Sequence, residues 1–454
     1  MGDDPIRPDE LAGLFQHALD PAGEAGVALA VSGGSDSTAL MVLVADWLAQ
    51  NRLSPSRALV LTVDHGLRPG SAAEASAVAD HAKALGLPHA TLAWTDPKPQ
   101  TGLQATAREA RYRLIAACMR ERGLTRLLTA HTADDQAETL LMRLARGSGL
   151  DGLSAMAPVS VNAAHGLTIL RPLLAVPKAR LQATLRQRGI GWFEDPSNQS
   201  PAFERVRLRA ARGRLEALGL TNERLALSAR RLARARAVVE QAAAAFWDPA
   251  AGHVHADQCG YFRIAAPALR TAPLEIAVRV LARAIAAAGG SSAPVPLAGV
   301  EGIAEALQED KPGATAWTLA RAAISATSDY VFVVREPGRE PLPRLPLAAG
   351  TRALWDGRFR VTAGPALEAG LELAALGAEG AREARQALPA AREVPLQALA
   401  ALPAVWRGPV LIGVPGLPFW LPGTARPDVA TTFAGCDRYN WSSAPETPSE
   451  GELS

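Results

Sequence analysis

A short run of serines and glycines carries the clearest chemical signal in this chain. It consists of Ser32, Gly33, Gly34, Ser35, Asp36 and Ser37. Glycines let the backbone come close to an anion, and free N–H groups and hydroxyls at the start of a helix bind phosphate. A carboxylate repels phosphate, so we expect Asp36 to hold Mg²⁺ that bridges phosphate oxygens. The loop has no following Gly-Lys-Ser/Thr, so it is not a Walker A loop.

The segments on either side predict how this loop is held. The apolar run 27–31 indicates a buried strand, and residues 38–47 have the spacing of a helix with Leu40, Leu43 and Trp47 on one side. A Ser/Gly turn with Ser35 or Asp36 as helix cap is the structural alternative. Placed between strand and helix, the run resembles the pyrophosphate loop of the N-type ATP pyrophosphatases, or PP-loop superfamily. That resemblance implies ATP as substrate and Mg²⁺.

A second group of polar residues follows another expected strand, 127–129. His131 precedes a predicted helix, 133–144, whose first turns carry Asp134, Asp135 and Glu138. Asp135 and Glu138 are three residues apart and share a helix face. These carboxylates favour binding of a metal or a cationic substrate, although complementing the helix dipole would also explain them.

A third group lies after the expected strand 58–63. It contains Asp64, His65 and Arg68, and Arg111 on a long predicted helix, 101–122, is a further candidate. A turn would explain Asp64 without a binding role, and a solvated basic face would explain Arg111. Ligands bind open α/β sheets at the carboxyl ends of parallel strands. We therefore expect all three groups to meet at one edge.

Alternating strands and helices predict an α/β fold with a doubly wound parallel sheet, Rossmann-like, in segment 1–212. Residues 168–174 are expected at its edge. A mainly helical RNA-binding domain, 213–336, follows, with residues 240–310 mostly helical and a terminal hairpin at 317–335. Segment 347–436 is expected as a small α+β module beginning with a hairpin around Asp356-Gly357, and 437–454 as a disordered tail.

Composition narrows the class of protein. The 454 residues carry a net charge of +2 and 48% hydrophobic residues, which is typical of globular domains. We see no apolar run that could span a membrane and no secretory signal in the first residues. Cys118, Cys259 and Cys436 are far apart and form no zinc or disulfide pattern, which favours a cytoplasmic location.

Arginines gather in the middle of the chain, where acidic residues are sparse. The candidates for contacts with an RNA backbone are Arg207, Arg209, Arg230, Arg231, Arg234 and Arg236. Arginine is well suited to phosphate. A solvated helix in an arginine-biased proteome is the alternative.

Six motifs together resemble the tRNA(Ile)-lysidine synthetases over residues 25–210. They are VSGGSDST, VDHGLR, AREARY, TAHTADDQAETLLMRLARGSGLDGL, RPLL and WFEDPSN. The resemblance implies ATP-dependent joining of L-lysine to C2 of the wobble cytidine of tRNA(Ile) with a CAU anticodon. It departs at Thr132, where a second His is common, and at Val206, where Asn is usual.

The resemblance implies roles for particular residues. ATP would bind at Ser32–Ser37, Asp36, His131 and Arg111 would be catalytic, and Arg205 would contact phosphate. Asp135 and Glu138 would select the lysine ammonium. His131 or a carboxylate would take the proton from the attacking amine.

Three other classes of protein are alternatives to this function. A tRNA thiolation enzyme generally needs reactive or cluster-binding cysteines, and the isolated cysteines argue against it. A small-molecule amidotransferase would carry an N-terminal Cys or a glutaminase-like domain, which the sequence lacks. A non-catalytic tRNA-binding protein would not need an intact SGGSDS loop. The sequence leaves the oligomeric state open, with a homodimer among the alternatives.

Overall fold

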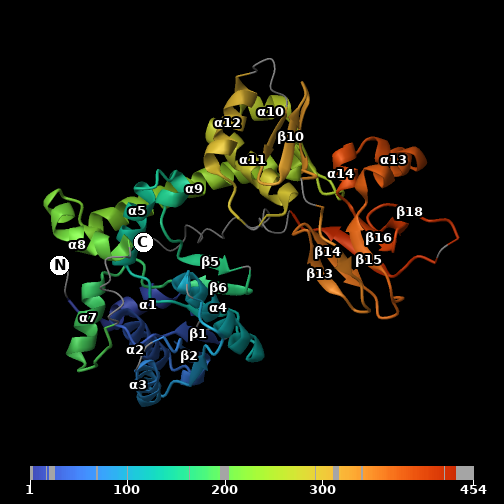
Figure 1. Ribbon diagram of the computed structural model, residues 1–454. Coiled ribbons are helices and arrows are strands. Elements are labelled where there is room, and N and C mark those ends of the chain that lie inside the picture. The colour runs from blue at the N-terminus through green and yellow to red at the C-terminus, as the bar shows by residue number, and fades with distance from the viewer. Residues whose placement is uncertain are drawn as a thin grey trace. The chain divides into compact units, whose positions relative to one another are not determined.

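The computed structural model describes residues 4–16, 18–19, 26–67, 70–99, 101–162, 164–194, 204–291, 293–309, 316–338, 341–423 and 425–435. The chain forms two compact units, Met1–Arg236 and Ala237–Ser454 (Figure 1). Arg68 and the predicted tail, 437–454, lie outside the described residues. The finer division into segments 1–212, 213–336 and 347–436 stays a prediction.

A six-stranded sheet forms the centre of the first unit. Its strands are β1 (Val27–Ala30), β2 (Ala58–Asp64), β3 (His89–Ala93), β4 (Arg126–Leu128), β5 (Val159–Asn162) and β6 (Leu167–Leu170). The order is β3-β2-β1-β4-β6-β5, and every pairing is parallel except the antiparallel β5–β6 pair. The predicted α/β fold with a doubly wound, mostly parallel sheet is confirmed.

Helices connect and cover these strands. They are η1 (Pro8–Glu10), α1 (Leu11–Phe15), α2 (Ser35–Gln50), η2 (Pro55–Arg57), α3 (Ser71–Ala84), α4 (Leu103–Glu121), α5 (Ala133–Leu144), α6 (Leu150–Leu153), α7 (Lys178–Gln187), α8 (Glu204–Ala217) and α9 (Asn222–Trp247). The predicted bounds of α5 agree with those observed, whereas α2 begins three residues earlier than expected.

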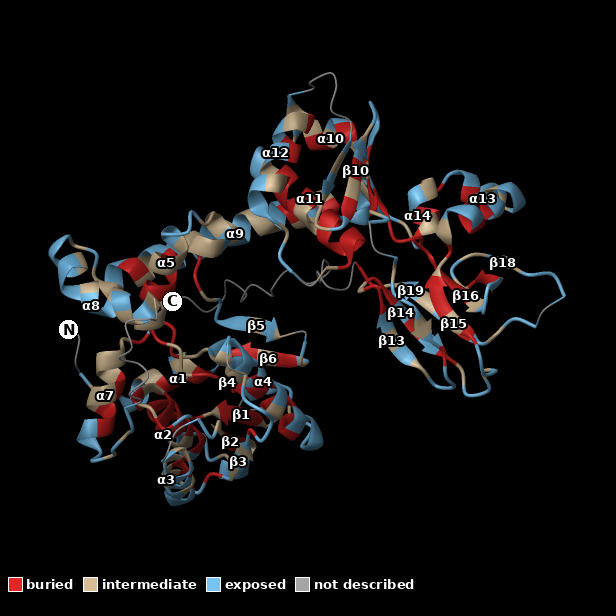
Figure 2. Cartoon of the chain, viewed as in Figure 1, coloured by how far each residue is buried: buried red, intermediate tan, exposed pale blue. Residues whose placement is uncertain are grey.

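Alternating strand residues bury the two faces of the sheet in different cores. Leu29 and Leu128 pack with α1, α2, α3 and α7, while their neighbours Ala28 and Leu127 pack with α4. Successive side chains of a strand point to opposite faces, so a strand covered on both sides is apolar throughout. Figure 2 shows the resulting buried strands and helix faces in red.

The expected position of residues 168–174 at the sheet edge is wrong. These residues contribute to β6, which lies between β4 and β5, and β5 is the edge strand. The side chains of Val159 and Val161 in β5 are 51% and 72% exposed. Such a strand lacks the buried apolar pattern by which strands are detected.

The described residues of the second unit form three antiparallel sheets. Its strands are β7 (Val254–Ala256), β8 (Phe262–Ala265), β9 (Ala316–Leu319), β10 (Ala322–Ala326), β11 (Tyr330–Arg335), β12 (Leu345–Pro346), β13 (Arg352–Trp355), β14 (Phe359–Ala363), β15 (Glu372–Ala375), β16 (Pro403–Arg407), β17 (Val410–Val414), β18 (Phe419–Trp420) and β19 (Val429–Phe433). The sheets have the orders β7-β8-β11-β10-β9, β12-β15-β16-β17-β18 and β13-β14-β19.

The helices of this unit divide between two cores. They are η4 (Pro249–Ala251), α10 (Ala266–Thr271), α11 (Leu274–Gly289), α12 (Leu297–Gln308), α13 (Gly377–Ala387), η5 (Pro389–Arg392) and α14 (Leu396–Ala400). Helices α10, α11 and α12 pack on the first sheet, and α13 and α14 pack with the other two. The expectation that residues 240–310 are mostly helical missed β7 and β8, which are too short to show a clear period.

The hairpin predicted around Asp356-Gly357 joins β13 and β14. Both residues have positive φ, 46° and 65°, as the two central positions of a type I′ turn require, and Arg358 N donates to Trp355 O at 2.9 Å. Asp356 is buried and accepts hydrogen bonds from Arg335 and Arg358 at 2.9 and 2.8 Å. Burial opposes ionisation, yet these bonds hold the pKa of Asp356 below its ordinary value.

Among the described residues, no helix combines the length and apolar character needed to cross a bilayer. The described cysteines, Cys118 and Cys259, are buried free thiols.

Candidate functional site

The predicted phosphate loop lies between β1 and the first turn of α2. Gly34 is the residue before the helix and has no side chain to cap it, so the N–H groups of the first turn face outward from the helix end. Ser37 Oγ accepts from Ser32 N at 3.2 Å and donates to Gly34 O at 3.1 Å, which fixes the loop. This geometry suits an anion at the positive end of α2.

Gly33 is required by its conformation and by its surroundings. Its φ is +84°, and an added Cβ would lie 3.1 Å from the ring of Phe193. Its carbonyl accepts a hydrogen bond from Phe193 N at 2.9 Å. The loop is therefore held from the side by the segment after α7.

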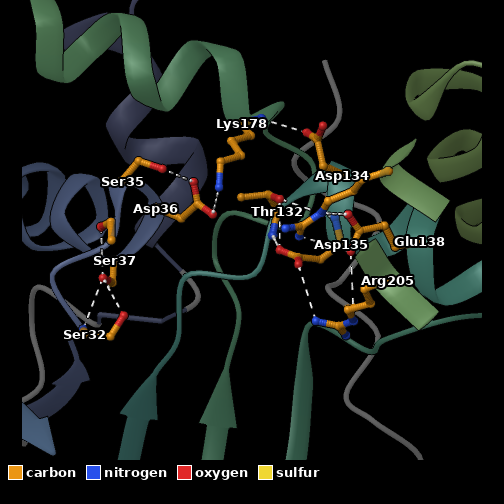
Figure 3. A network of polar contacts seen from close by, with 12 residues as sticks. Ser32, Ser35, Asp36, Ser37, Thr132, Asp134, Asp135, Glu138, Lys178 and Arg205 are labelled. Carbon is orange, nitrogen blue, oxygen red and sulfur yellow. Dashed lines mark hydrogen bonds and ion pairs between the residues drawn. The ribbon is translucent and has the colours of Figure 1, made fainter. Parts of the chain in front are cut away.

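Asp36 is paired with a residue that sequence reasoning missed. Lys178 Nζ lies 3.0 Å from Asp36 Oδ2, and Ser35 Oγ donates to Asp36 Oδ1 at 3.0 Å (Figure 3). Burial raises the pKa of Asp36, and Lys178 opposes that rise. Two features of the sequence could have drawn attention to Lys178. Lysine is rare, since Lys178 is one of four in the chain, and Lys178 begins a helix directly after proline.

The acidic residues at the start of α5 have different structural roles. Asp135 Oδ2 accepts from Thr132 N at 2.8 Å, and Thr132 Oγ1 accepts from Asp135 N at 3.4 Å, which is a capping box. Asp134 accepts from Lys178 N at 2.8 Å and from Asn222 Nδ2 at 2.7 Å. Asp134 therefore ties α5 to α7 and α9. The departure at Thr132 supplies the helix cap.

Three arginines of α8 face these acids. Arg209 Nε lies 2.6 Å from Glu138 Oε1, and Arg205 lies 3.9 Å from both Asp135 and Glu138. Arg212 Nη1 lies 3.5 Å from Asp134 Oδ1. Figure 3 shows the loop residues and the α5 acids on opposite sides of Lys178, with Arg205 beside the acids.

Histidines follow two strands of the same sheet, β2 and β4, which lie on either side of β1. Burial lowers the pKa of His131 to about 4, and its Nδ1 lies 3.0 Å from Thr129 Oγ1. His65 also has its pKa lowered to about 4, first by burial and then by Arg111, whose Nη2 lies 3.2 Å from its Nε2. Both imidazoles are therefore uncharged at neutral pH.

Two adjoining cavities connect these residues. One, of about 910 Å³, is lined by most of the predicted site residues: Ser32, Gly34, Ser35, Asp36, Ser37, Asp64, His65, Arg111, His131, Asp135, Arg205 and Arg209. The other, of about 310 Å³, is lined by Asp134 and Glu138 and shares Asp36, Asp135, Lys178 and Arg209 with the first. Both lie at the carboxyl edge of the sheet, where parallel folds bind ligands.

Other predicted residues lie away from the cavities or have local roles. Asp64 accepts from Gly66 N at 2.9 Å, so it forms a turn, and a hydrogen bond from Ser71 is the main cause lowering its pKa. Arg207, Arg230, Arg231 and Arg234 are exposed on α8 and α9. Arg236 pairs with Asp151 at 2.7 Å.

The fold and the loop define an ATP-binding protein of the PP-loop class, and the PP-loop domain family matches residues 9–213. A tRNA(Ile)-lysidine synthase of Methylobacterium nodulans is 48% identical over 301 residues, covering 66% of this chain and 86% of that protein. Those of Bradyrhizobium diazoefficiens and Ruegeria pomeroyi are 44% and 38% identical, covering 81% and 88% of this chain and 97% and 90% of those proteins. The chain belongs to the tRNA(Ile)-lysidine synthase family.

Proposed function

We propose that this protein uses ATP to join L-lysine to C2 of the wobble cytidine of tRNA(Ile) with a CAU anticodon. The tRNA is adenylated first, and AMP and pyrophosphate are released. One observation carries the proposal: the phosphate loop and the acids of α5 line adjoining cavities that share Asp36 and Asp135. On this proposal, an ATP site and a cation site would meet at one sheet edge.

ATP would lie with its phosphates on Ser32–Ser37, where the start of α2 presents N–H groups and Ser35 and Ser37 present hydroxyls. Asp36 fits a magnesium ligand, because Mg²⁺ is often held by one or two carboxylates, with phosphate oxygens and waters completing its shell. Bound Mg²⁺ would neutralise phosphate charge. Lys178, whose Nζ pairs with Asp36, would contact the same phosphates.

In the first step, the C2 oxygen of cytidine attacks the α-phosphate and pyrophosphate leaves. Arg111 and Arg205 line the larger cavity and would offset the charge that develops on phosphate. The second step needs an uncharged lysine amine, which attacks C2 and displaces AMP. His131, whose pKa is lowered to about 4, or Asp135 would accept its proton, since both line the larger cavity.

The smaller cavity suits a lysine side chain. Its acidic wall contains Asp134, Asp135 and Glu138, and its apolar wall contains Leu141, Leu208, Leu215 and Leu220. A tetramethylene chain ending in an ammonium group matches that combination, because apolar carbons pack on the leucines and the charge meets carboxylates.

RNA would be held by the exposed Arg207 of α8 and by Arg230, Arg231 and Arg234 of α9, whose charge suits a phosphate backbone. The cytoplasm, where tRNA is present and thiols stay reduced, is the proposed compartment. A homodimer remains an alternative to a monomer, to be decided by light scattering.

The test is direct product analysis. Purified protein, ATP, Mg²⁺, radiolabelled lysine and a tRNA(Ile) transcript with a CAU anticodon are incubated, and the RNA is digested for mass spectrometry. We expect lysine on the wobble cytidine in an ATP-dependent reaction. Label absent from RNA, or sulfur or ammonia incorporated in its place, would contradict the proposal.

A further inference from the structure

Helix α8 presents a row of arginines to the acids of α5. Arg205, Arg209 and Arg212 are spaced i, i+4 and i+7, so they share one helix face. Each is paired with α5: Arg205 with Asp135 and Glu138, Arg209 with Glu138, and Arg212 with Asp134. The carboxylates assigned to lysine are therefore already matched by cations of the chain itself.

Arg209 makes the closest of these contacts. Its Nε and Nη2 donate to the two oxygens of Glu138 at 2.6 and 3.3 Å. The Glu138 side chain is 11% exposed and that of Arg209 is 45% exposed. A carboxylate this buried is costly to leave unpaired, so Glu138 needs a cation in every state of the site.

Arginine and the substrate lysine resemble each other at this position. Both place a positive charge at the end of an apolar chain, and Leu208, beside Arg209 in sequence, lines the same cavity. The Arg209 guanidinium therefore occupies the position that the lysine ammonium would need at Glu138.

We propose that Arg209 is an internal competitor for the lysine site and that an RNA backbone phosphate releases it. The proposal rests on the proposed function, from which the lysine role of Glu138 is taken. Phosphate offers arginine the same two-oxygen geometry as a carboxylate, so Arg209 can exchange Glu138 for RNA without losing hydrogen bonds. Glu138 is then open to lysine only when RNA is in place.

Because Arg209 contacts both sites in this proposal, the binding of RNA and the binding of lysine affect each other. If RNA strengthens lysine binding through Arg209, lysine must strengthen RNA binding by the same factor. The coupling would keep free lysine from occupying the site, and lysine would be admitted once its acceptor is bound.

Titration calorimetry of L-lysine into the full-length protein tests this, with and without an RNA hairpin carrying the CAU anticodon loop. For the unaltered protein we expect RNA to tighten lysine binding about tenfold, within the usual range of couplings. Arg209→Gln should bind lysine about tenfold more tightly without RNA, with little further gain on adding RNA. Arg209→Lys should keep part of the coupling, because its charge still pairs with Glu138.

Arg214→Gln, an exposed arginine on the same helix, is the matched control and should behave like the unaltered protein. Thermal melts confirm that each variant is folded. Weaker lysine binding by Arg209→Gln would overturn the inference, and so would an RNA-induced gain in lysine affinity that is the same in this variant as in the unaltered protein. In either case, lysine incorporation by the unaltered protein would leave the proposed function standing. No lysine binding under any condition would overturn both.

Discussion

Lys178 Nζ lies 3.0 Å from Asp36 Oδ2, so the first residue of α7 forms an ion pair with the phosphate loop of α2, 142 positions earlier in the chain. Their side chains are 38% and 23% exposed. The Asp36 carboxylate is thus paired with the Lys178 ammonium at the position proposed for Mg²⁺ and phosphate.

Asp36→Asn should abolish adenylation without lowering the melting temperature at neutral pH. Burial is the main cause of the raised pKa of Asp36, so the folded state holds the proton more tightly than the unfolded state does. Ionisation therefore costs stability above the ordinary pKa of Asp, and the amide removes that cost. AMP formation and thermal melting are measured together.

Asp46→Asn is the matched control for that substitution. Asp46 lies on the same helix and pairs with Arg188 at a partly exposed position, so its loss should cost at most about 1 kcal/mol and spare activity. AMP formation by Asp36→Asn within about tenfold of normal, about 1.4 kcal/mol in barrier, would contradict a metal role for Asp36.

Glu138→Gln should raise the KM for lysine far more than the KM for ATP, and adenylated tRNA should accumulate. The physical reason is loss of the buried carboxylate that would hold the ammonium group. Steady-state kinetics with each substrate varied, plus isolation of the adenylated RNA, measures the effect. An unaltered lysine KM would show that Glu138 serves only to hold Arg209.

Asp135→Ala should combine a binding defect with a stability defect. Asp135 closes the capping box with Thr132, and loss of a cap costs roughly 0.5–2 kcal/mol. Melting curves for Asp135→Ala and Glu138→Gln separate these effects, since Glu138 has no part in the cap. Equal melting temperatures would contradict the capping role.

Replacing Arg230, Arg231 and Arg234 with Ala should weaken tRNA binding and flatten its salt dependence. These side chains are exposed on α9, and each lost phosphate contact should reduce the log–log slope by about 0.7 to 0.9. Filter binding over a range of salt concentrations gives the slope. If it equals that of the unaltered protein, this part of α9 is merely a solvated surface.

Asp356→Ala should destabilise the second unit by about 3–5 kcal/mol. The substitution removes the carboxylate that pairs with Arg335 and Arg358, and the Arg358 side chain is fully buried. Chemical denaturation measures the loss, with Asp329→Ala at an exposed turn as control. A loss no larger than that of the control would show that the arginines find other partners.

Much of the first unit could be predicted because its signals are local. The bounds of α5 follow from its apolar spacing, and the strand-end rule brought His65, His131 and the Ser32–Ser37 loop to one sheet edge. The strand β5 could not be predicted, because its valines are exposed at the sheet edge and show no buried pattern. Strands β7 and β8 could not be predicted because they are too short to show a clear period-2 pattern.

The charge pairing within the site could not be predicted from sequence. The sequence showed that arginines gather in this part of the chain, but a solvated face, an RNA contact and an ion pair with α5 give the same pattern. Lys178 reaches Asp36 only through the packing of α7 on α2. Such partners depend on tertiary packing, which no local motif records.

The most direct test of the central claim is exchange of radiolabelled pyrophosphate into ATP. In the proposed reaction tRNA is adenylated before lysine reacts, so exchange should require the CAU-anticodon tRNA and proceed without lysine. Asp36→Asn should abolish it and Glu138→Gln should preserve it. Exchange that needs lysine but not tRNA would contradict the account, because lysine would then be the group that ATP activates.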